Sequence, residues 1–169
     1  MARELCVSSE LIWTTKTPSK VRFFLWLAAK GHCSTADNLE KKGWPHEEHC
    51  VLCQREDESC SHLLLTCDYT QRVWLLMKKW IGISFPVSGH EEENLTDWWT
   101  NARRFFRTGY RDIFDSVVAL ICWSLWKERN VRIFEQKVRT PEQLVEDIKE
   151  EILVWKTAGV IQPCNNDHL

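Results

Sequence analysis

The stretch CVLCQREDESCSHLLLTC, residues 50–67, contains the side chains that decide how this chain folds. Cys50 and Cys53 are separated by two residues, His62 follows after eight more, and Cys67 follows after another four. A structural zinc site takes four cysteine or histidine ligands in a tetrahedron, and two cysteines on a tight turn supply one edge of it. The spacing therefore predicts one closed zinc site, with the ligands Cys50, Cys53, His62 and Cys67.

Three nearby side chains could replace a member of this ligand set. His46, His49 and Cys60 lie close in the sequence, and the thiolate of Cys60 would bind zinc as strongly as the imidazole of His62. A Cys-x-x-Cys pair also occurs in redox-active sites, which lie at strand-to-helix junctions of βαβ units. The pattern of this chain is helical and supplies no such junction, so we favour the metal site.

The last two ligands are five residues apart, which has a structural consequence. On a regular α-helix this separation is a rotation of about 500°, so the two side chains would point in different directions. His62 and Cys67 can face one ion only if the helix bends or unwinds near Cys67. Asp68 can cap a new helix after such a break.

Apolar residues recur at helical spacing through most of the chain, between capping residues and terminating glycines. The predicted helices cover residues 18–30, a short segment from Ser34 or Thr35 to Gly43, residues 68–81, 95–106 and 111–136, and a last helix from Thr140-Pro141 to Gly159. Only the segment from Leu5 to Thr14 is expected to be extended. The predicted fold is all-α, mainly helical, with a small zinc knuckle and a C-terminal helical hairpin.

The periodicity is interrupted after Gly82, where Pro86, Gly89 and the acidic residues 91–93 replace large apolar side chains. We therefore predict four regions. Residues 1–82 form the zinc-binding domain, 83–94 a linker, 95–160 a helical tail region, and 161–169 a frayed C-terminus.

The predicted hairpin covers Asp112 to Trp155, with its turn fixed by Thr140-Pro141. Its expected buried face consists of Val117, Leu120, Ile121, Trp126, Leu144, Ile148 and Ile152. The apolar stretch from Ile113 to Trp126 is wider than a contact between two helices covers. We therefore expect a protein partner on that stretch.

Charge and composition limit how this chain could bind nucleic acid. The 169 residues include 22 Lys and Arg against 24 Asp and Glu, a formal charge of −2, so any nucleic-acid contact must be local. Three basic segments, residues 16–30, 72–79 and 103–111, lie beside aromatic residues, and either base stacking or a helical core could use those rings. The candidate nucleic-acid-binding residues are Lys16, Lys20, Arg22, Lys30, Arg72, Lys78, Lys79, Arg103, Arg104 and Arg107.

The N-terminal sequence MARELCVSSELIW lacks the apolar stretch of a signal peptide. We therefore expect an intracellular protein, nuclear or cytoplasmic and not secreted, whose thiols stay reduced. The longest apolar stretch, from Val117 to Trp126, is too short to cross a bilayer.

Several motifs together resemble the zinc-binding domain that follows the polymerase in reverse transcriptases of plant non-LTR (LINE-type) retrotransposons. They are Trp13, the run Pro18 to Trp26, Thr35 to Leu39, Lys42-Gly43, Cys50 to Cys53, Glu58, His62 to Leu64, Cys67 and Val73-Trp74. The run Trp123 to Phe134 is similar to the tail that commonly follows this domain. The family commonly has proline at position 51 and an aliphatic residue at position 60, where this chain has Val51 and Cys60.

The resemblance implies a zinc-binding domain of retrotransposon origin, with Zn²⁺ held by the same four residues. Its relatives carry a polymerase with adjacent metal-binding aspartates, and this sequence contains no Asp-Asp pair. We therefore expect a non-catalytic domain that binds nucleic acid, RNA in particular, as single-stranded RNA or DNA. The alternative is a zinc-stabilised helical scaffold that contacts a polymerase or another protein. No membrane and no small-molecule substrate is expected.

Overall fold

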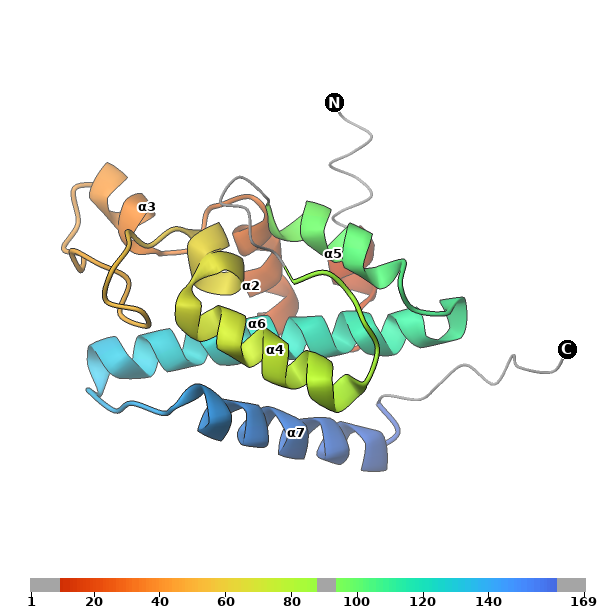
Figure 1. Cartoon of the computed structure of the whole chain (residues 1–169). Coiled ribbons are helices and arrows are strands. Elements are labelled where there is room, and N and C mark those ends of the chain that lie inside the picture. The colour runs from red at the N-terminus through yellow and green to blue at the C-terminus, as the bar shows by residue number, and fades with distance from the viewer. Residues whose placement is uncertain (1–9, 88–93, 161–169) are drawn as a thin grey trace, which may run out of the picture.

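The structure is a computed structural model that describes residues 10–87 and 94–160, and all regular structure within those ranges is helical (Figure 1). Residues 10–14 form a first helical turn. The elements that follow are α2 (Ser19–Ala29), α3 (Ala36–Lys41), the π-helical turn η1 (His62–Thr66), α4 (Asp68–Ile81), α5 (Leu95–Arg103), the 3₁₀ turn η2 (Thr108–Tyr110), α6 (Arg111–Phe134) and α7 (Pro141–Thr157). The prediction of an all-α fold is confirmed.

Most helix boundaries lie within a few residues of those that capping residues predict. Gly31, Gly43, Gly82 and Gly159 all have positive φ, which lets glycine end a helix in the left-handed conformation. The extended segment expected from Leu5 to Thr14 is wrong for residues 10–14, which are helical, and residues 5–9 lie outside the described residues.

The longest helix, α6, forms the centre of the molecule (Figure 1). Every residue from Phe114 to Cys122 is buried, so this part of the helix is covered on all sides. The elements that pack against it are α2, α5, α7, η1 and η2. A helix that is apolar all round is stable only in such surroundings.

This burial corrects one expectation. The apolar stretch from Ile113 to Trp126 is not open to a protein partner, because five elements of the same chain cover it rather than one. Ile113, Trp123 and Trp126 are partly buried and pack against the same core. The prediction of a partner surface on this stretch is therefore wrong.

The C-terminal hairpin is present, and α7 packs against both α6 and α4. Thr140 begins α7 as a full capping box: its hydroxyl accepts the N–H of Gln143, and the Gln143 side chain accepts the N–H of Thr140. Six of the seven residues of the expected buried face are buried, and the seventh, Trp126, is partly buried.

We expect Ile148→Asp to destabilise the protein by at least about 3 kcal/mol, because Ile148 is only 1% exposed and the new carboxylate would be buried without a partner. Glu146→Lys, on the exposed side of the same helix, should change stability by less than about 1 kcal/mol. Urea unfolding of both variants measures the difference. Equal losses would contradict the packing of α7 against α4 and α6.

The two larger regions predicted from the sequence share one hydrophobic core. A single cluster of buried residues includes Val21 and Leu63 from the first region and Leu120 and Ile148 from the second. Phe85, in the predicted linker, is 1% exposed and packs against Phe106 and Phe114. Residues 88–93 of that linker and the predicted frayed tail 161–169 lie outside the described residues. The division into separate units stays a prediction.

Among the helices of residues 10–87 and 94–160, none is both long and apolar enough to cross a membrane.

Candidate metal centre

The side chains of Cys50, Cys53, His62 and Cys67 converge, and their four donor atoms all lie within 4.8 Å of one another. The sulfurs of Cys50 and Cys67 are 3.9 Å apart, and the sulfur of Cys53 lies 3.4 Å from Nε2 of His62. With Zn–S bonds of about 2.3 Å, a tetrahedral site separates its sulfurs by about 3.8 Å. The cluster therefore suits zinc in both ligand type and spacing.

The first two cysteines lie on a tight turn. The N–H of Gln54 donates to the carbonyl of Cys50 at 2.7 Å, and the N–H of Cys50 donates to the carbonyl of Glu56 at 2.8 Å. Gln54 has a φ of 57°, in the left-handed region, which reverses the chain after Cys53. The turn places both sulfurs on the same side.

The turn η1 places the other two ligands. The N–H of Cys67 donates to the carbonyl of His62, five residues back, at 2.8 Å, whereas an α-helix would bond across four. Cys67 then has a ψ of 137°, so the helix is broken before α4 begins. The predicted break at Cys67 is therefore present. Asp68 is the first residue of α4 rather than its cap, and its carboxylate lies 3.6 Å from Arg55.

Hydrogen bonds within the cluster favour a thiolate at Cys50. The bond with Cys67 lowers the pKa of Cys50 to about 4 against the opposing effect of burial, and His62 acts in the same direction. The same bond, together with burial, raises the pKa of the Cys67 thiol. Burial lowers the pKa of His62, but bonds to the sulfurs of Cys50 and Cys53 outweigh it and raise that pKa to about 9. The cluster therefore favours a bound positive charge, which a divalent cation would supply.

The second ring nitrogen of His62 has its own partners. Nδ1 lies 3.4 Å from Oε2 of Glu56 and 3.4 Å from the hydroxyl of Thr66. Metal-ligating histidines commonly hold their second nitrogen in this way, which fixes the orientation of the ring. The sequence predictions missed both residues, although the position of Thr66, four residues after His62 on a helix, was a usable signal.

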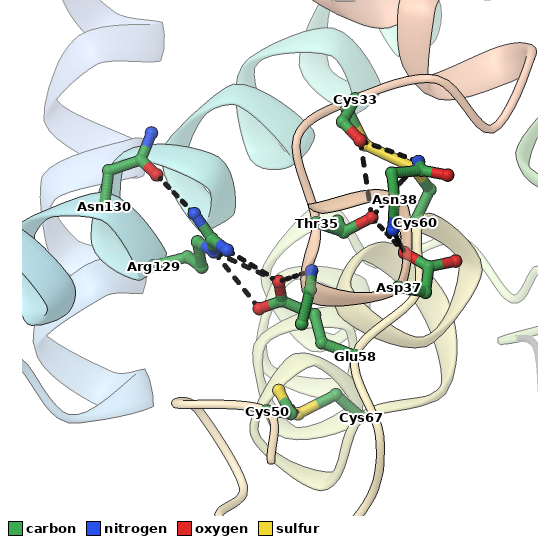
Figure 2. Close-up of polar contacts among 11 residues, drawn as sticks. Cys33, Thr35, Asp37, Asn38, Cys50, Glu58, Cys60, Cys67, Arg129 and Asn130 are labelled. Atoms are coloured by element: carbon green, nitrogen blue, oxygen red, sulfur yellow. Dashed lines mark hydrogen bonds and ion pairs between the residues drawn. A yellow bond between two sulfur atoms is a disulfide. The ribbon is translucent and has the colours of Figure 1, made fainter. Parts of the chain in front are cut away.

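The three alternative ligands lie outside the cluster. Cys60 forms a disulfide with Cys33, 27 residues earlier, with their Cα atoms 6.7 Å apart (Figure 2). The expectation that all thiols stay reduced is therefore wrong for this pair, because the fold brings the two residues within disulfide range. His46 and His49 are exposed. His46 hydrogen bonds through Nδ1 to the carbonyl of Trp44, and His49 lies near Asp57.

A buried ion pair joins the segment between the ligand pairs to α6 (Figure 2). Nη2 of Arg129 donates to Oε1 of Glu58 at 2.8 Å, and the two side chains are 4% and 2% exposed. Glu58 also accepts the N–H of Ala36 at 2.9 Å. The sequence predictions missed the pair because its members are 71 residues apart.

Two of the ten candidate nucleic-acid-binding residues have acidic partners. Arg72 donates to Glu142 at 3.0 Å, and Arg103 donates to both carboxylate oxygens of Asp115, at 3.2 and 3.0 Å. These pairs neutralise part of the second and third basic segments. Their carboxylates lie far along the chain or on another helix, so the local sequence could not reveal them.

The remaining candidates lie at the surface or on aromatic rings. Lys30 is 3.9 Å above the ring of Trp26, Lys20 is 5.8 Å from that of Trp123, and Lys78 is 5.9 Å from that of Phe85. Arg22 donates to the carbonyl of Trp13 and to Ser19. The other four candidates are exposed: Lys16, Lys79, Arg104 and Arg107.

Comparison with known proteins gives three findings. Residues 2–74 match the family described as zinc-binding in reverse transcriptase. A protein of Arabidopsis thaliana, named as a candidate ribonuclease H protein, is 25% identical over 141 residues, which cover 82% of this chain and 22% of that protein, so the chain spans about a fifth of the relative. No solved structure matches the chain. The plant relative fits a retrotransposon origin, and residues 2–74 are similar to the zinc-binding domains of reverse transcriptases.

Proposed function

We propose that Cys50, Cys53, His62 and Cys67 bind one zinc ion as a closed structural site. Four protein ligands fill a tetrahedral coordination sphere and leave no position for an activated water. The zinc would then hold the turn at Cys50 and Cys53 to the start of α4. We infer a binding role for this domain rather than a catalytic one.

We further propose that the domain binds single-stranded RNA through the α2 face, the exposed surface formed by α2 and the residues that flank it, from Lys16 to Lys30. The observation that carries this proposal is the charge of that face. Lys16, Lys20, Arg22 and Lys30 form no ion pair with any residue that the structure describes, whereas Arg72 and Arg103 are paired with acids. The positive charge of the first basic segment is therefore not neutralised within the described residues and is available to an external partner.

Aromatic rings lie beside these cations. Phe23 is 53% exposed and stacks on Trp26 with 6.1 Å between ring centroids, and Trp13 is 44% exposed. Lysine next to an exposed ring combines a phosphate contact with a stacking surface, which suits single strands with unpaired bases. By contrast, Trp74, Trp98 and Trp99 are buried and belong to the core. The reverse-transcriptase family supports an association with nucleic acid.

A salt titration tests the proposal. Binding of the zinc-loaded chain to fluorescently labelled single-stranded RNA should weaken as salt rises, with a slope of about 0.7 per phosphate contact. In Lys20→Glu/Lys30→Glu the slope should fall by about 1.4, because two contacts are lost. Phe23→Ala should cost about 1–3 kcal/mol of binding if a base stacks there.

The matched control is Lys41→Glu/Lys137→Glu, which makes the same change of charge at two exposed lysines away from α2. Equal weakening in the control would show that net charge, rather than the α2 face, governs binding. Absence of salt-dependent binding to RNA would contradict the proposal. Tighter binding to single-stranded DNA of the same sequence would contradict the choice of RNA.

The second candidate function is a protein-interaction scaffold, and a different surface favours it. At the neighbouring ends of α4 and α7, Trp80, Ile83 and Leu153 are 42%, 38% and 54% exposed. Lys149 of α7 lies 5.9 Å from the ring of Trp80, so the two helices present these side chains together. If RNA binding is absent, this surface becomes the leading candidate.

A further inference from the structure

Side chains of α6 contact two segments of the metal centre, although α6 lies outside residues 2–74. These are the turn from Cys50 to Cys53, called the knuckle below, and the segment between Cys53 and His62. Arg132 donates from Nη1 to the carbonyl of Val51 at 2.9 Å and to that of Leu52 at 3.5 Å. These are the two residues between the first pair of cysteines. Arg129 holds the following segment through Glu58, which stands between Cys53 and His62.

The contact with Val51 and Leu52 controls the direction of two N–H groups. In a trans peptide the C=O of one residue and the N–H of the next point in opposite directions. A guanidinium that holds the carbonyls of Val51 and Leu52 therefore turns the N–H groups of Leu52 and Cys53 to the other side. Arg132 thereby fixes two of the peptide groups that link Cys50 to Cys53. Contacts of this kind outside the ligand set hold metal ligands in position.

Arg132 is itself held in place. Its Nε donates to Oε1 of Glu128 at 3.2 Å, and its Nη2 donates to the carbonyl of Arg139 at 3.1 Å. Glu128 is fully buried and also accepts the N–H of Arg139 at 2.8 Å. The guanidinium is therefore held by contacts other than those with the turn.

We propose that Arg132 is a positioning residue of the zinc site and that α6 completes this site by fixing the turn that carries Cys50 and Cys53. The proposal rests on the ligand set proposed above. It extends the zinc-binding unit beyond the residues that match the family, into the run Trp123 to Phe134. Within that run, Glu128 holds Arg132, and Arg132 holds the turn.

The test measures zinc affinity by competition with a chelator, together with the absorption spectrum of the cobalt-loaded protein. In Arg132→Gln, the Kd for zinc should rise about 10- to 100-fold, as outer-shell changes typically produce. The cobalt bands should shift, because the turn that carries Cys50 and Cys53 is no longer held by Arg132. Arg132→Lys keeps a charge and one donor, so it should recover part of the affinity.

The matched control is Arg111→Gln, which makes the same change at a second arginine of α6 that donates to a backbone carbonyl, in this case that of Phe106, away from the metal centre. Its Kd for zinc and its cobalt spectrum should match those of the unchanged protein. An unchanged Kd and spectrum in Arg132→Gln, or equal effects in the two variants, would overturn the positioning role alone. Absence of thiolate-to-cobalt bands in the unchanged protein would overturn the ligand set, and the inference with it.

Discussion

Cys67→Ser is expected to leave the chain largely unfolded, a larger loss than removal of any one buried aliphatic side chain would cause. Structural zinc sites contribute apparent binding energies of about 10–16 kcal/mol, comparable with a typical total stability of about 5–15 kcal/mol. Cys67 is a proposed ligand and the N-cap residue of α4, but its side chain makes no capping hydrogen bond, so the substitution acts through the metal. Circular dichroism during thermal unfolding, with saturating zinc, measures the loss.

The absorption spectrum of the cobalt-loaded protein shows which residues are ligands, independently of their effect on stability. Cys60→Ser should leave the thiolate-to-cobalt bands unchanged, because Cys60 is bonded to Cys33 and lies outside the cluster. A loss of bands in Cys60→Ser, with none in Cys67→Ser, would show that the fourth ligand is wrong.

Hydrogen exchange after chelation shows how far the effect of the metal extends. We expect lost protection in α4 and in the part of α6 around Arg129 and Arg132, because these side chains contact the knuckle and the segment after it. Protection in α5 should fall less, because most of its packing is with α2 and α6, and Trp98 packs against one ring of α4, that of Trp74. Full protection throughout residues 111–157 would instead support the predicted division between 1–82 and 95–160.

Arg129→Ala is expected to destabilise the zinc-loaded protein by about 3–5 kcal/mol. The substitution leaves the carboxylate of Glu58, which is 2% exposed, buried without its cation. Arg72→Ala is the control, because it removes an arginine from a pair in which both side chains are 55% exposed. Such pairs are worth about 0–1 kcal/mol, so urea unfolding should separate the two variants clearly.

A double variant tests the reason for that loss. In Glu58→Leu/Arg129→Met both charges are replaced by apolar side chains of similar size, so no charge remains buried alone. Stability should recover toward that of the unchanged protein, as it does when buried ion pairs are replaced together. A double variant as unstable as Arg129→Ala would show that the specific hydrogen bonds of Glu58, including that to Ala36, matter more than the charge.

The helices were predictable because their signals are local. Thr140 and Gln143 are three residues apart, so the capping box is visible in the sequence. The spacing of Cys50, Cys53, His62 and Cys67 similarly predicts a cluster, and the five-residue step to Cys67 predicts a break in the helix. The sequence could not show that the break is a π-helical turn, because the type of turn depends on which carbonyl accepts the N–H of Cys67.

The parts that could not be predicted depend on partners distant in sequence. Arg103 read as a candidate for phosphate contact, yet it pairs with Asp115 on α6. Arg129 and Arg132 gave no signal of a role near the metal, since their partners lie about 70 to 80 residues earlier. Phe85 read as part of a linker because its neighbours are turn residues, although its own ring is buried. Each of these contacts depends on the three-dimensional fold, and no spacing of residues in the sequence indicates it.

The contact between α6 and the knuckle also has a consequence for biosynthesis. Ribosomes add about 5–20 residues per second, so Arg132 emerges roughly 3–13 s after Cys67. During that interval a nascent chain holds all four proposed ligands, while Glu58 lacks its cation and the Val51 carbonyl lacks its donor. We expect zinc captured at this stage to be held by the four ligands alone and to exchange faster with cellular chelators. If Arg132 has the proposed role, the arrival of α6 completes the site, so the rate of translation sets the time at which zinc becomes firmly bound.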